Sequence, residues 1–423
     1  MARVLLILPS ATYRASAFLE AAAAMGVEVM TGSERPAAMA GTMGARFVEL
    51  DLDDPAAAAE AIVVADRARP FDAVVAVDDQ GLLCAALASE RLGLAHNPAD
   101  AVAATRDKIE QRRRLGAGEV RQPRWRPLLL DELAAAEPGA AGVKVLRAAD
   151  ALGYPVVLKP AGLSASRGVI RADDQAELLA ALERDLRLLD RLGEAPRLVL
   201  EEYVPGTEHA LEGVLFQGEL ETVAIFDKPD PLVGPFFEET IYVTPSRLAA
   251  ADQRDLAALV QRAAGVIGLR EGPVHAEARR AETGQLVLLE VAARTIGGRC
   301  AAALRSGANS LEALVLAHAL GERARPVALE GASGVVMLPI ARSGRLVRFE
   351  GAERAAKVPH VVGVELTAPV GEMLEALPEG GRYLGFVFAR ADTPDQVVAA
   401  LRAAQRELEI EIAPEIPTPP EAQ

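Results

Sequence analysis

The first hundred residues alternate between continuous apolar runs and segments with helical spacing. Continuous apolar runs are typical of parallel strands that are buried on both faces of a sheet. The alternation therefore predicts a doubly wound α/β domain over residues 1–105. The expected strands are 3–8, 27–31, 46–50 and 72–77, and the expected helices are about 14–25, 55–68 and 80–92.

The ends of these strands give the first functional expectations. The turn Leu8–Thr12 lacks the Gly-x-Gly-x-x-Gly pattern, which argues against a dinucleotide site there. Asp79 follows a strand at the edge where such sheets bind ligands, and it either faces a ligand or caps the next helix. The apolar run Val4–Leu8 stops at Pro9 without a small-residue cleavage site, so we expect a first strand rather than a signal peptide.

Composition narrows the class of partner. The chain has 423 residues, a net charge of −15 and 51% hydrophobic residues, which is typical of a globular protein. An acidic balance argues against nucleic acid or an anionic membrane as the main partner. Cys84 and Cys300 cannot form a disulfide framework, and no apolar stretch approaches the roughly 20 residues of a membrane span. We expect a cytoplasmic protein with small-molecule partners, and its oligomeric state, with a homodimer as the working expectation, stays open.

Residues beyond the first domain form further units. A helix is expected at 98–115, and the proline-containing stretch 116–145 is predicted to be a linker with short elements. Residues 330–412 mix strands with a helix near 394–407, and the Pro-rich tail 413–423 is expected to be disordered. In between, the expected strands are 154–159, 168–170, 197–203, 210–216, 219–227, 272–279 and 285–292, with helices near 173–192, 247–267 and 309–320.

A lysine-led loop is the first motif that indicates chemistry. Only five of the 45 Lys and Arg residues are lysines, and Lys159 ends a strand directly before the small-residue stretch 161–168. Small residues let backbone N–H groups approach an anion, and lysine supplies a point charge. The stretch is not a Walker A loop, and a flexible hairpin loop is the alternative interpretation.

A second motif runs from Leu198 to His209, where apolar residues lead into Glu201 and Glu202 and then into a Pro-Gly turn. Carboxylates and backbone groups at such a turn can bind an adenine edge, and Glu208 can accept hydrogen bonds from ribose hydroxyls. The alternative is a solvated strand end with a type II turn.

The third motif is a predicted hairpin. If Thr283 and Gly284 form its turn, Glu277 lies directly opposite Glu290, amid apolar neighbours. A four-residue turn is the alternative, which would keep the facing sides but shift the diagonal neighbours. Like charges that face each other across a strand pair are destabilising, so a cation should lie between them, and oxygen ligands suit magnesium. The alternative is that nearby arginines neutralise both acids. The same register places His275 opposite Ala292, and Arg294 follows closely enough to hold an anion.

In this order, these motifs resemble the ATP-grasp superfamily. The resemblance implies a mixed α/β (α+β) ATP-grasp fold: an N-terminal Rossmann-like pre-ATP-grasp domain at 1–105, a central ATP-grasp domain with two α+β subdomains at 106–325, and a C-terminal closing domain at 326–412. The lid subdomain would span about 145–205. The implied cofactors are ATP and Mg²⁺, with Mn²⁺ as a substitute.

The resemblance also implies residue roles. Glu277 and Glu290 would bind the metal, and Arg294, Lys159 and Ser166 would be catalytic. Substrate would meet His275, Arg294, Gly297, Gly298 and Lys228, although a loop salt bridge is an equal alternative for Lys228. The nucleotide would be bound by Lys108, Lys159, Gly162, Ser164, Ser166, Gly168, Glu201, Glu202, Tyr203, Val204 and Glu208.

One position departs from the family pattern. The last signature resembles Glu-x-Asn-x-Arg, but Ala292 stands where asparagine is usual. This puts the ligand set of a second magnesium in doubt, and we hypothesise that His275 or water replaces the asparagine.

Segments 234–245 and 290–298 and the C-terminal unit are similar to L-amino-acid ligases, the dipeptide synthases. This similarity implies an ATP-dependent ligase that joins two amino acids or amino-acid-like acids through an acyl phosphate and releases ADP and phosphate. The alternatives are a carboxylase or purine-pathway enzyme that uses bicarbonate or formate, and a nucleotide-binding module with degraded catalysis. The sequence does not identify the substrates.

Overall fold

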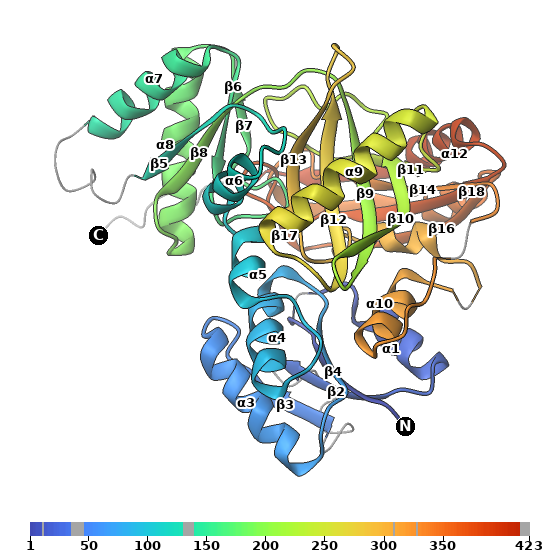
Figure 1. Ribbon diagram of the computed structural model, residues 1–423. Coiled ribbons are helices and arrows are strands. Elements are labelled where there is room, and N and C mark those ends of the chain that lie inside the picture. The colour runs from blue at the N-terminus through green and yellow to red at the C-terminus, as the bar shows by residue number, and fades with distance from the viewer. Residues whose placement is uncertain (11, 35–45, 130–138, 308, 327–328, 415–423) are drawn as a thin grey trace, which may run out of the picture. The chain divides into compact units, whose positions relative to one another are not determined.

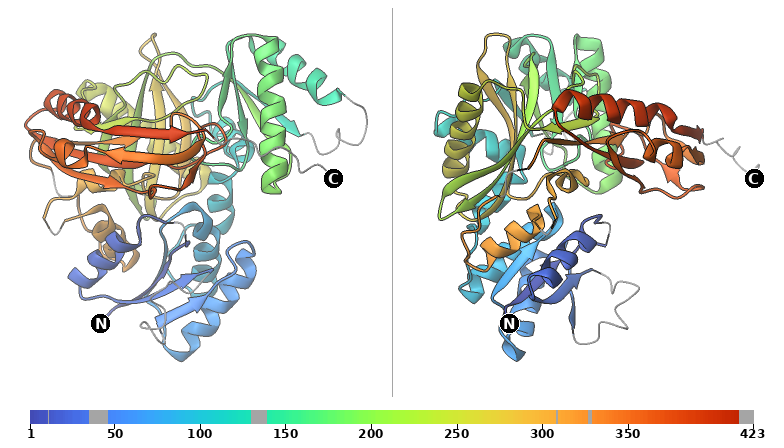
Figure 2. Two further views of the ribbon diagram at one scale, coloured as in Figure 1. Left: turned by 180° about the vertical axis from the view of Figure 1, so that it is seen from behind. Right: turned by 90° about the vertical axis from the view of Figure 1, so that its right-hand side faces the viewer.

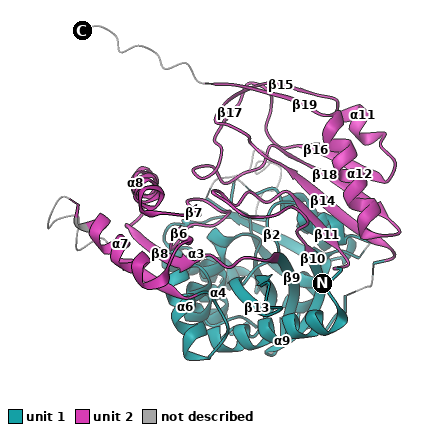
Figure 3. Ribbon diagram, turned by 90° about the horizontal axis from the view of Figure 1, so that it is seen from above, with its two compact units in different colours: residues 1–123, 208–226, 247–329 teal, residues 124–207, 227–246, 330–423 magenta. Residues whose placement is uncertain are grey.

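The protein is described by a computed structural model that covers residues 1–10, 12–34, 46–129, 139–307, 309–326 and 329–414. The chain divides into two compact units, coloured separately in Figure 3. Unit 1 contains Met1–Pro123, Glu208–Phe226 and Arg247–Leu329, and unit 2 contains Arg124–Thr207, Asp227–Ser246 and Glu330–Gln423. These units are defined by contacts, so the domain boundaries expected from the sequence remain a prediction.

Unit 1 begins with the predicted parallel α/β arrangement. Its four strands pair in the order β3-β2-β1-β4, and all three pairings are parallel. Buried Leu5 and Ile7 of the central strand pack in a core that includes Ile62 of a covering helix. The elements are β1 (Arg3–Ile7), α1 (Ala15–Ala24), β2 (Glu28–Ser33), β3 (Phe47–Glu49), α3 (Pro55–Ala68), β4 (Ala73–Ala76) and α4 (Asp79–Leu92).

The rest of unit 1 contains a second sheet, in which β13, β12, β9 and β10 are consecutive neighbours. Helix α9 packs against β12 and β13, as Figure 1 shows. The helix expected at 98–115 is in fact two helices, because Asp107 accepts hydrogen bonds from the N–H groups of Ile109 and Glu110 and starts a new one. The elements are α5 (Ala99–Thr105), α6 (Lys108–Ala117), β9 (Thr207–Phe216), β10 (Glu219–Asp227), α9 (Ala250–Ile267), β12 (Gly272–Arg280), β13 (Leu286–Ala292), the 3₁₀ helix η2 (Cys300–Leu304) and α10 (Leu311–Ala319).

Unit 2 contains a four-stranded sheet in the order β5-β8-β6-β7. The stretch 116–145 contains a short edge strand, as expected of a linker with short elements, and the start of a 13-residue helix that was not predicted. Pro127 is tolerated in that strand because only one side of an edge strand is paired, and Val145, Ala149 and Leu152 are buried at helical spacing. The elements are β5 (Trp125–Leu129), α7 (Ala140–Leu152), β6 (Val156–Pro160), β7 (Ile170–Ala172), α8 (Gln175–Leu192) and β8 (Arg197–Glu202).

Unit 2 also contains the C-terminal strands. Strands β11, β14, β18 and β16 are neighbours in that order, and α12 packs against β14 and β18 (Figure 2). Ala413 still pairs with Arg345, and residues 415–423 of the predicted tail lie outside the described residues. None of the helices formed by the described residues is long and apolar enough to cross a membrane. The elements are β11 (Ile241–Thr244), β14 (Ala332–Leu338), β15 (Gly344–Glu350), α11 (Ala352–Ala356), β16 (Val361–Leu366), β17 (Met373–Leu374), β18 (Gly385–Ala391), α12 (Pro394–Glu407) and β19 (Glu409–Ala413).

Candidate functional site

The predicted site residues divide between the two units. Unit 1 contains Lys108, Glu208, His275, Glu277, Glu290, Arg294, Gly297 and Gly298, and unit 2 contains Lys159, Gly162, Ser164, Ser166, Gly168, Glu201, Glu202, Tyr203, Val204 and Lys228.

The hairpin of β12 and β13 places the two predicted metal ligands face to face. Glu277 pairs directly with Glu290, and His275 pairs with Ala292, so the predicted pairing is confirmed. The predicted two-residue turn is wrong. Ala281 N–H donates to the carbonyl of Gln285, which leaves a three-residue loop that ends at Gly284 with φ +80°. Three-residue hairpin loops commonly have glycine in this left-handed position.

A β-bulge corrects the register between the turn and the acids. Ala278 pairs with Leu288, whereas Glu277 pairs with Glu290, so Leu289 is an extra residue on β13. Side chains alternate between the two faces of a strand. If Leu289 were an ordinary paired residue instead of a bulge, Glu290 would therefore lie on the face opposite to that of Glu277. The bulge therefore brings the two carboxylates to one face of the sheet.

Charged neighbours surround the pair. Lys108 Nζ lies 3.8 Å from Glu290 Oε1, so a lysine at the start of α6 reaches the acid on β13. A carboxylate oxygen of Glu208 lies within 4.8 Å of one of Glu277, and Arg279 Nε donates to Glu208 at 2.9 Å. Carboxylate oxygens are the ligands that a hard divalent cation prefers, so the chemistry of Glu277 and Glu290 fits magnesium.

His275 lies between two acids. Its Nδ1 is 3.1 Å from Glu212 Oε2, and its Nε2 is 3.6 Å from Glu277 Oε1. Burial alone would lower the pKa of His275, but the interactions with Glu212 and Glu277 outweigh burial and raise this pKa to about 9. A protonated imidazole orients and neutralises carboxylates, whereas a metal needs the neutral form. Its role as a replacement ligand at Ala292 remains a prediction.

Glu212 is a functional candidate that the motif analysis missed. It is completely buried, and both its carboxylate oxygens accept hydrogen bonds from Ile296 N–H, at 3.0 and 3.1 Å. Burial raises the pKa of Glu212, and His275 opposes that shift. The available signal was a single acid in the otherwise apolar run Ala210–Phe216 of β9.

Arg294 binds Asp79, the first residue of helix α4, which follows strand β4. Its Nε donates to Asp79 Oδ1 at 2.8 Å and its Nη1 donates to the Thr295 carbonyl at 3.0 Å. Burial alone would raise the pKa of Asp79, but Arg294 outweighs burial and holds this pKa below its usual value. Asp79 is the first residue of α4, with Asp78 at the N-cap position, and its carboxylate binds Arg294, so a ligand contact of Asp79 remains a prediction.

Buried Arg14 is a second residue that the sequence analysis missed. Its guanidinium donates to the Val77 carbonyl at 2.9 Å and also to Thr295 Oγ1 and the Ile296 carbonyl. Arg14 lies between β1 and α1, and its hydrogen bonds hold the segment that leads to Gly297 and Gly298. No pattern distinguishes it in sequence, because arginine is the common cation of this chain.

In unit 2, Lys159 and Glu201 form an ion pair. Lys159 Nζ donates to Glu201 Oε2 at 2.7 Å, and the Glu201 side chain is 2% exposed. Glu202 accepts from Arg124 N–H at 2.9 Å. Tyr203 stacks on Phe237 and lies under the guanidinium of Arg171. Val204 is buried.

The loop 161–168 has an unusual backbone. Ala165 and Ser166 both have φ +56°, and Gly168 has φ +67°. Left-handed conformations cost non-glycine residues about 1–2 kcal/mol each, and such strain is commonly found at ligand-binding loops. Gly162 and Ser164 are exposed, whereas Gly168 is buried and its N–H donates to the Pro378 carbonyl at 2.8 Å.

Lys228 is buried in an ion pair. Its Nζ lies 2.5 Å from Glu239 Oε1 and 4.9 Å from the centre of the Tyr242 ring, and Tyr242 Oη also donates to Glu239 at 2.6 Å. The structure therefore shows the salt bridge, and a substrate contact of Lys228 remains a prediction.

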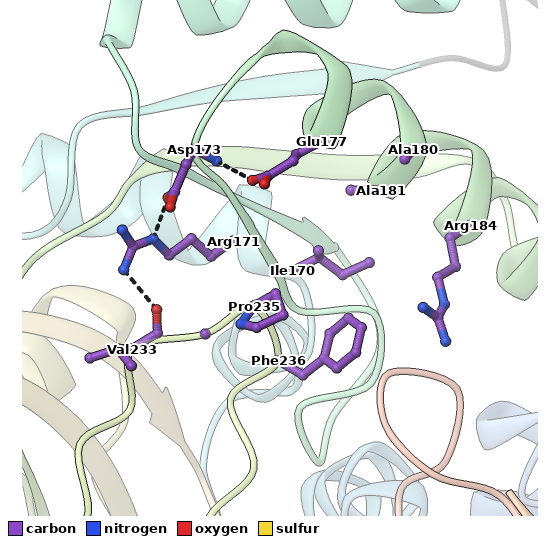
Figure 4. A pocket seen from close by; sticks show the side chains of 11 residues that line it. Ile170, Arg171, Asp173, Glu177, Ala180, Ala181, Arg184, Val233, Pro235 and Phe236 are labelled. Atoms are coloured by element: carbon purple, nitrogen blue, oxygen red, sulfur yellow. Dashed lines mark hydrogen bonds and ion pairs between the residues drawn. The ribbon is translucent and has the colours of Figure 1, made fainter. Parts of the chain in front are cut away.

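A pocket of about 450 Å³ in unit 2 has none of the predicted site residues in its lining. Arg171 lines this pocket and binds Asp173 and the Val233 carbonyl, as Figure 4 shows. Arg184 lies 5.1 Å from the centre of the Phe236 ring. Arg171 of this lining also stacks on Tyr203, one of the predicted nucleotide-binding residues.

Three parts of the chain match known domain families. Residues 19–96 match the ATP-grasp N-terminal domain, residues 152–303 the ATP-grasp domain, and residues 336–413 the L-amino acid ligase C-terminal domain 2. The order of these matches agrees with the order expected from the motifs.

Two curated relatives are named as a synthase and a ligase. Carnosine synthase 1 of Gallus gallus is 32% identical over 240 residues, which are 54% of this chain and 25% of that protein. Alanine–anticapsin ligase of Bacillus subtilis is 28% identical over 249 residues, which are 53% of this chain and 49% of that protein. The matches thus span about a quarter and about half of these relatives' lengths.

A solved structure is similar over almost the whole chain. The L-amino acid ligase from Bacillus licheniformis is 25% identical, with a TM-score of 0.78 over 98% of this chain and 99% of that chain. The predicted ATP-grasp fold is thereby confirmed. Together with the three domain matches, this similarity shows that the chain belongs to the ATP-grasp superfamily, with a C-terminal domain of the L-amino acid ligase type.

Proposed function

We propose that this protein is an ATP-dependent ligase that joins the carboxylate of one amino acid, or amino-acid-like acid, to the amine of another. The observation that carries the proposal is the pair of carboxylates, Glu277 and Glu290, that face each other on one hairpin. The similarity to an L-amino acid ligase over nearly the whole chain supports the substrate class.

Glu277 and Glu290 would bind Mg²⁺, or Mn²⁺ in its place. The carboxylate oxygens of the two facing acids are donors that suit both ions. The bound ion would neutralise phosphate oxygens, which is the main electrostatic requirement of phosphoryl transfer. Lys108, 3.8 Å from Glu290, would add a point charge on the phosphates.

The remaining nucleotide contacts follow the sequence assignment. Lys159 would bind the phosphates, with Gly162, Ser164, Ser166 and Gly168 of the strained loop around them. Glu201, Glu202, Tyr203 and Val204 would hold the adenine, and Glu208 would accept from the ribose.

A carboxylate is a poor electrophile and must be activated before an amine can attack it. The proposed route is attack of the substrate carboxylate on the γ-phosphate, which gives an acyl phosphate and ADP, followed by displacement of phosphate by the amine. Arg294 would stabilise the transferred phosphoryl group and the oxyanion, and Ser166 in the loop 161–168 would help exclude water. The two amino-acid substrates would contact His275, Gly297, Gly298 and Lys228.

Ala292 favours one competing function, ATP binding without turnover, because an expected metal ligand is replaced by an apolar residue. A carboxylase-type reaction with bicarbonate or formate is the other alternative. The proposal also retains the expectations of a cytoplasmic location and a homodimer, on which the reaction does not depend.

The test is a screen for phosphate release with ATP, Mg²⁺ and pairs of amino acids, followed by mass spectrometry of the products. We expect phosphate release that requires two amino acids and a product lighter than their sum by one water. Turnover only with bicarbonate or formate, or ATP binding without turnover, would establish an alternative instead.

Replacement of Glu290 tests the metal assignment. We expect Glu290→Ala to reduce ADP formation by more than about 100-fold, because even residues that only support metal ligands typically contribute 10–100-fold. Glu282→Ala is the matched control, since Glu282 is exposed in the loop of the same hairpin. Substantial turnover by the Glu290 variant would refute the assignment.

A further inference from the structure

Three side chains of helix α6 contact strand β13, which contains Glu290. Lys108, Gln111 and Arg112 are spaced i, i+3, i+4 on this helix and therefore share one face. Each contacts a different residue of β13. Lys108 reaches the side chain of Glu290, Gln111 binds the backbone of Val291, and Arg112 binds the carbonyl of Leu289.

Gln111 replaces a missing neighbour strand. Strand β13 lies at the end of its sheet, so β12 pairs only one of its edges. Gln111 Nε2 donates to the Val291 carbonyl at 2.7 Å, and Gln111 Oε1 accepts from Val291 N–H at 3.1 Å. A primary amide is the side-chain group that has a donor and an acceptor arranged like a peptide bond.

Arg112 acts on the bulge itself. Its Nη2 donates to the carbonyl of Leu289, the extra residue, at 2.5 Å, and the N–H of the preceding Leu288 donates to the Arg121 carbonyl at 3.0 Å. Gln111 and Arg112 are each 2% exposed. Buried polar groups of this kind are expensive to leave unpaired, so these contacts strongly favour one position of the bulge.

We propose that Gln111 and Arg112 are positioning residues that lock the bulge at Leu289 and thereby hold Glu290 on the same face as Glu277. Slippage of the bulge past Glu290 would turn its carboxylate away from Glu277, because neighbouring residues point to opposite faces. The inference rests on the proposed metal-binding function of the two acids. It adds that two residues of helix α6, which would contact neither the metal nor the nucleotide, hold the two metal-binding acids on one face.

The test measures metal binding separately from catalysis. Mn²⁺ binding to the full-length protein with ADP is followed by electron paramagnetic resonance, and backbone exchange of residues 286–292 is followed by deuterium uptake. The variants are Gln111→Ala and Gln111→Glu. The glutamate keeps an acceptor for Val291 N–H but cannot donate to the Val291 carbonyl. Arg112→Lys keeps a donor for the bulge, and Arg112→Met removes it.

Arg114→Ala is the matched control. Arg114 lies on the same helix but binds Glu110, Asp100 and the Ile267 carbonyl instead of β13. We expect Gln111→Ala, Gln111→Glu and Arg112→Met to weaken Mn²⁺ binding about 10–100-fold and to speed exchange in 286–292. Arg112→Lys should restore part of the affinity, and Arg114→Ala should leave it within about twofold.

Unchanged Mn²⁺ affinity in folded Gln111 and Arg112 variants would overturn the proposal, whether or not exchange is faster. Equal losses in the Arg114 control would also overturn it, because they would indicate general damage to the helix. Failure of the proposed function looks different: the unmodified protein would bind no Mn²⁺ that Glu290→Ala abolishes, and the positioning role would then fall with it. Urea unfolding of each variant excludes loss of folding as the cause.

Discussion

Lys159 shows how a single side chain can be chosen for its shape as well as its charge. Its ammonium is paired with the nearly buried carboxylate of Glu201 at 2.7 Å, in a chain that uses arginine for most of its cations. An ammonium is a compact point charge, whereas a guanidinium is a planar fork that needs more space and a different set of acceptors. The same charge in the other shape should therefore not substitute here.

We expect Lys159→Arg to weaken ATP binding about 10–100-fold, which corresponds to the loss of one charge-assisted hydrogen bond. Calorimetric titration with a non-hydrolysable ATP analogue measures this effect. Lys357→Arg is the control, because Lys357 is exposed. Equal affinity of the Lys159 variant and the unmodified protein would remove Lys159 from the phosphate site.

Asp185 has an unusual position at the base of the strained loop. It is completely buried, and within the described part of the chain neither of its carboxylate oxygens has a hydrogen-bond partner. Burial and, to a smaller extent, Glu379 raise its pKa to about 8 against the opposing effect of Arg184. A Cβ on Gly168 would lie 2.8 Å from Asp185 Oδ1, so the carboxyl group abuts the end of the loop.

The raised pKa predicts a pH dependence of stability. Between pH 4 and pH 8 the unfolded chain releases the Asp185 proton while the folded chain retains it, so the free energy of unfolding falls as pH rises. The resulting penalty at pH 8 is on the order of a few kcal/mol. Asp185→Asn should therefore raise the urea midpoint more at pH 8 than at pH 5. Asp190→Asn, at an exposed position of the same helix, serves as control, and an equal shift of the Asp185 variant at both pH values would contradict the prediction.

At the scale of residues, the sequence predicted the two acids that face each other across a hairpin, but it did not predict buried charged residues that bind to other elements. Glu277 and Glu290 could be paired because hairpin geometry relates distant positions by simple counting. Glu212 and Arg14, which the sequence analysis missed, act through contacts between elements, and no spacing along the chain relates them to the other site residues.

At the scale of elements, the hairpin was predicted correctly for an incomplete reason. A two-residue turn would align Glu277 with Glu290, and the structure reaches the same alignment with a three-residue loop and the extra Leu289. The residues of β13 do not mark the bulge, since Leu289 is one apolar residue among several. Its position depends on partners in α6, which lies far away in the sequence.

The sequence did not predict helix α7 and did not mark β5 as a strand. Val145, Ala149 and Leu152 are buried at helical spacing, but only Val145 of the three lies within the stretch 116–145 that was expected to be a linker. Strand β5 contains Pro127, which argued against a strand until its edge position was known. Edge or centre is a property of the sheet that a single segment does not reveal.

The strained loop and helix α8 are held by the C-terminal segment of unit 2. Gly168 N–H donates to the Pro378 carbonyl, Arg167 Nε donates to the Glu379 carbonyl at 3.1 Å, and Arg184 binds the Glu379 carboxylate through two nitrogens. These contacts join the loop that is proposed to cover the phosphates to the ligase-type C-terminal domain.

We expect Glu379→Gln to increase deuterium uptake in residues 161–169 by up to about fivefold, because a half-exposed ion pair contributes at most about 1 kcal/mol. Glu375→Gln is the control: it removes an ion pair with Arg191 that does not involve the loop. Unchanged uptake in the Glu379 variant would show that backbone contacts alone hold the loop.

At the scale of the whole molecule, the order of motifs was more informative than any one of them. A lysine before a small-residue loop, or two acids before a turn, each has an ordinary structural explanation, but their succession along the chain matches one superfamily. The net charge of −15 means that the proposed site must supply its own cations, and in unit 1 Lys108, Arg294 and Arg14 each form an ion pair with an acid, Glu290, Asp79 and Asp78 respectively. The identity of the substrates depends on side chains from several loops with no fixed spacing, so the sequence could not predict it.

The most direct test of the central claim follows oxygen from the carboxylate. The protein is incubated with ATP, Mg²⁺ and amino acids whose carboxylates are labelled with oxygen-18, and the released phosphate is analysed by mass spectrometry. Activation through an acyl phosphate predicts ADP, an amide product and phosphate that carries one labelled oxygen. Unlabelled phosphate, or label found in AMP, would contradict the account.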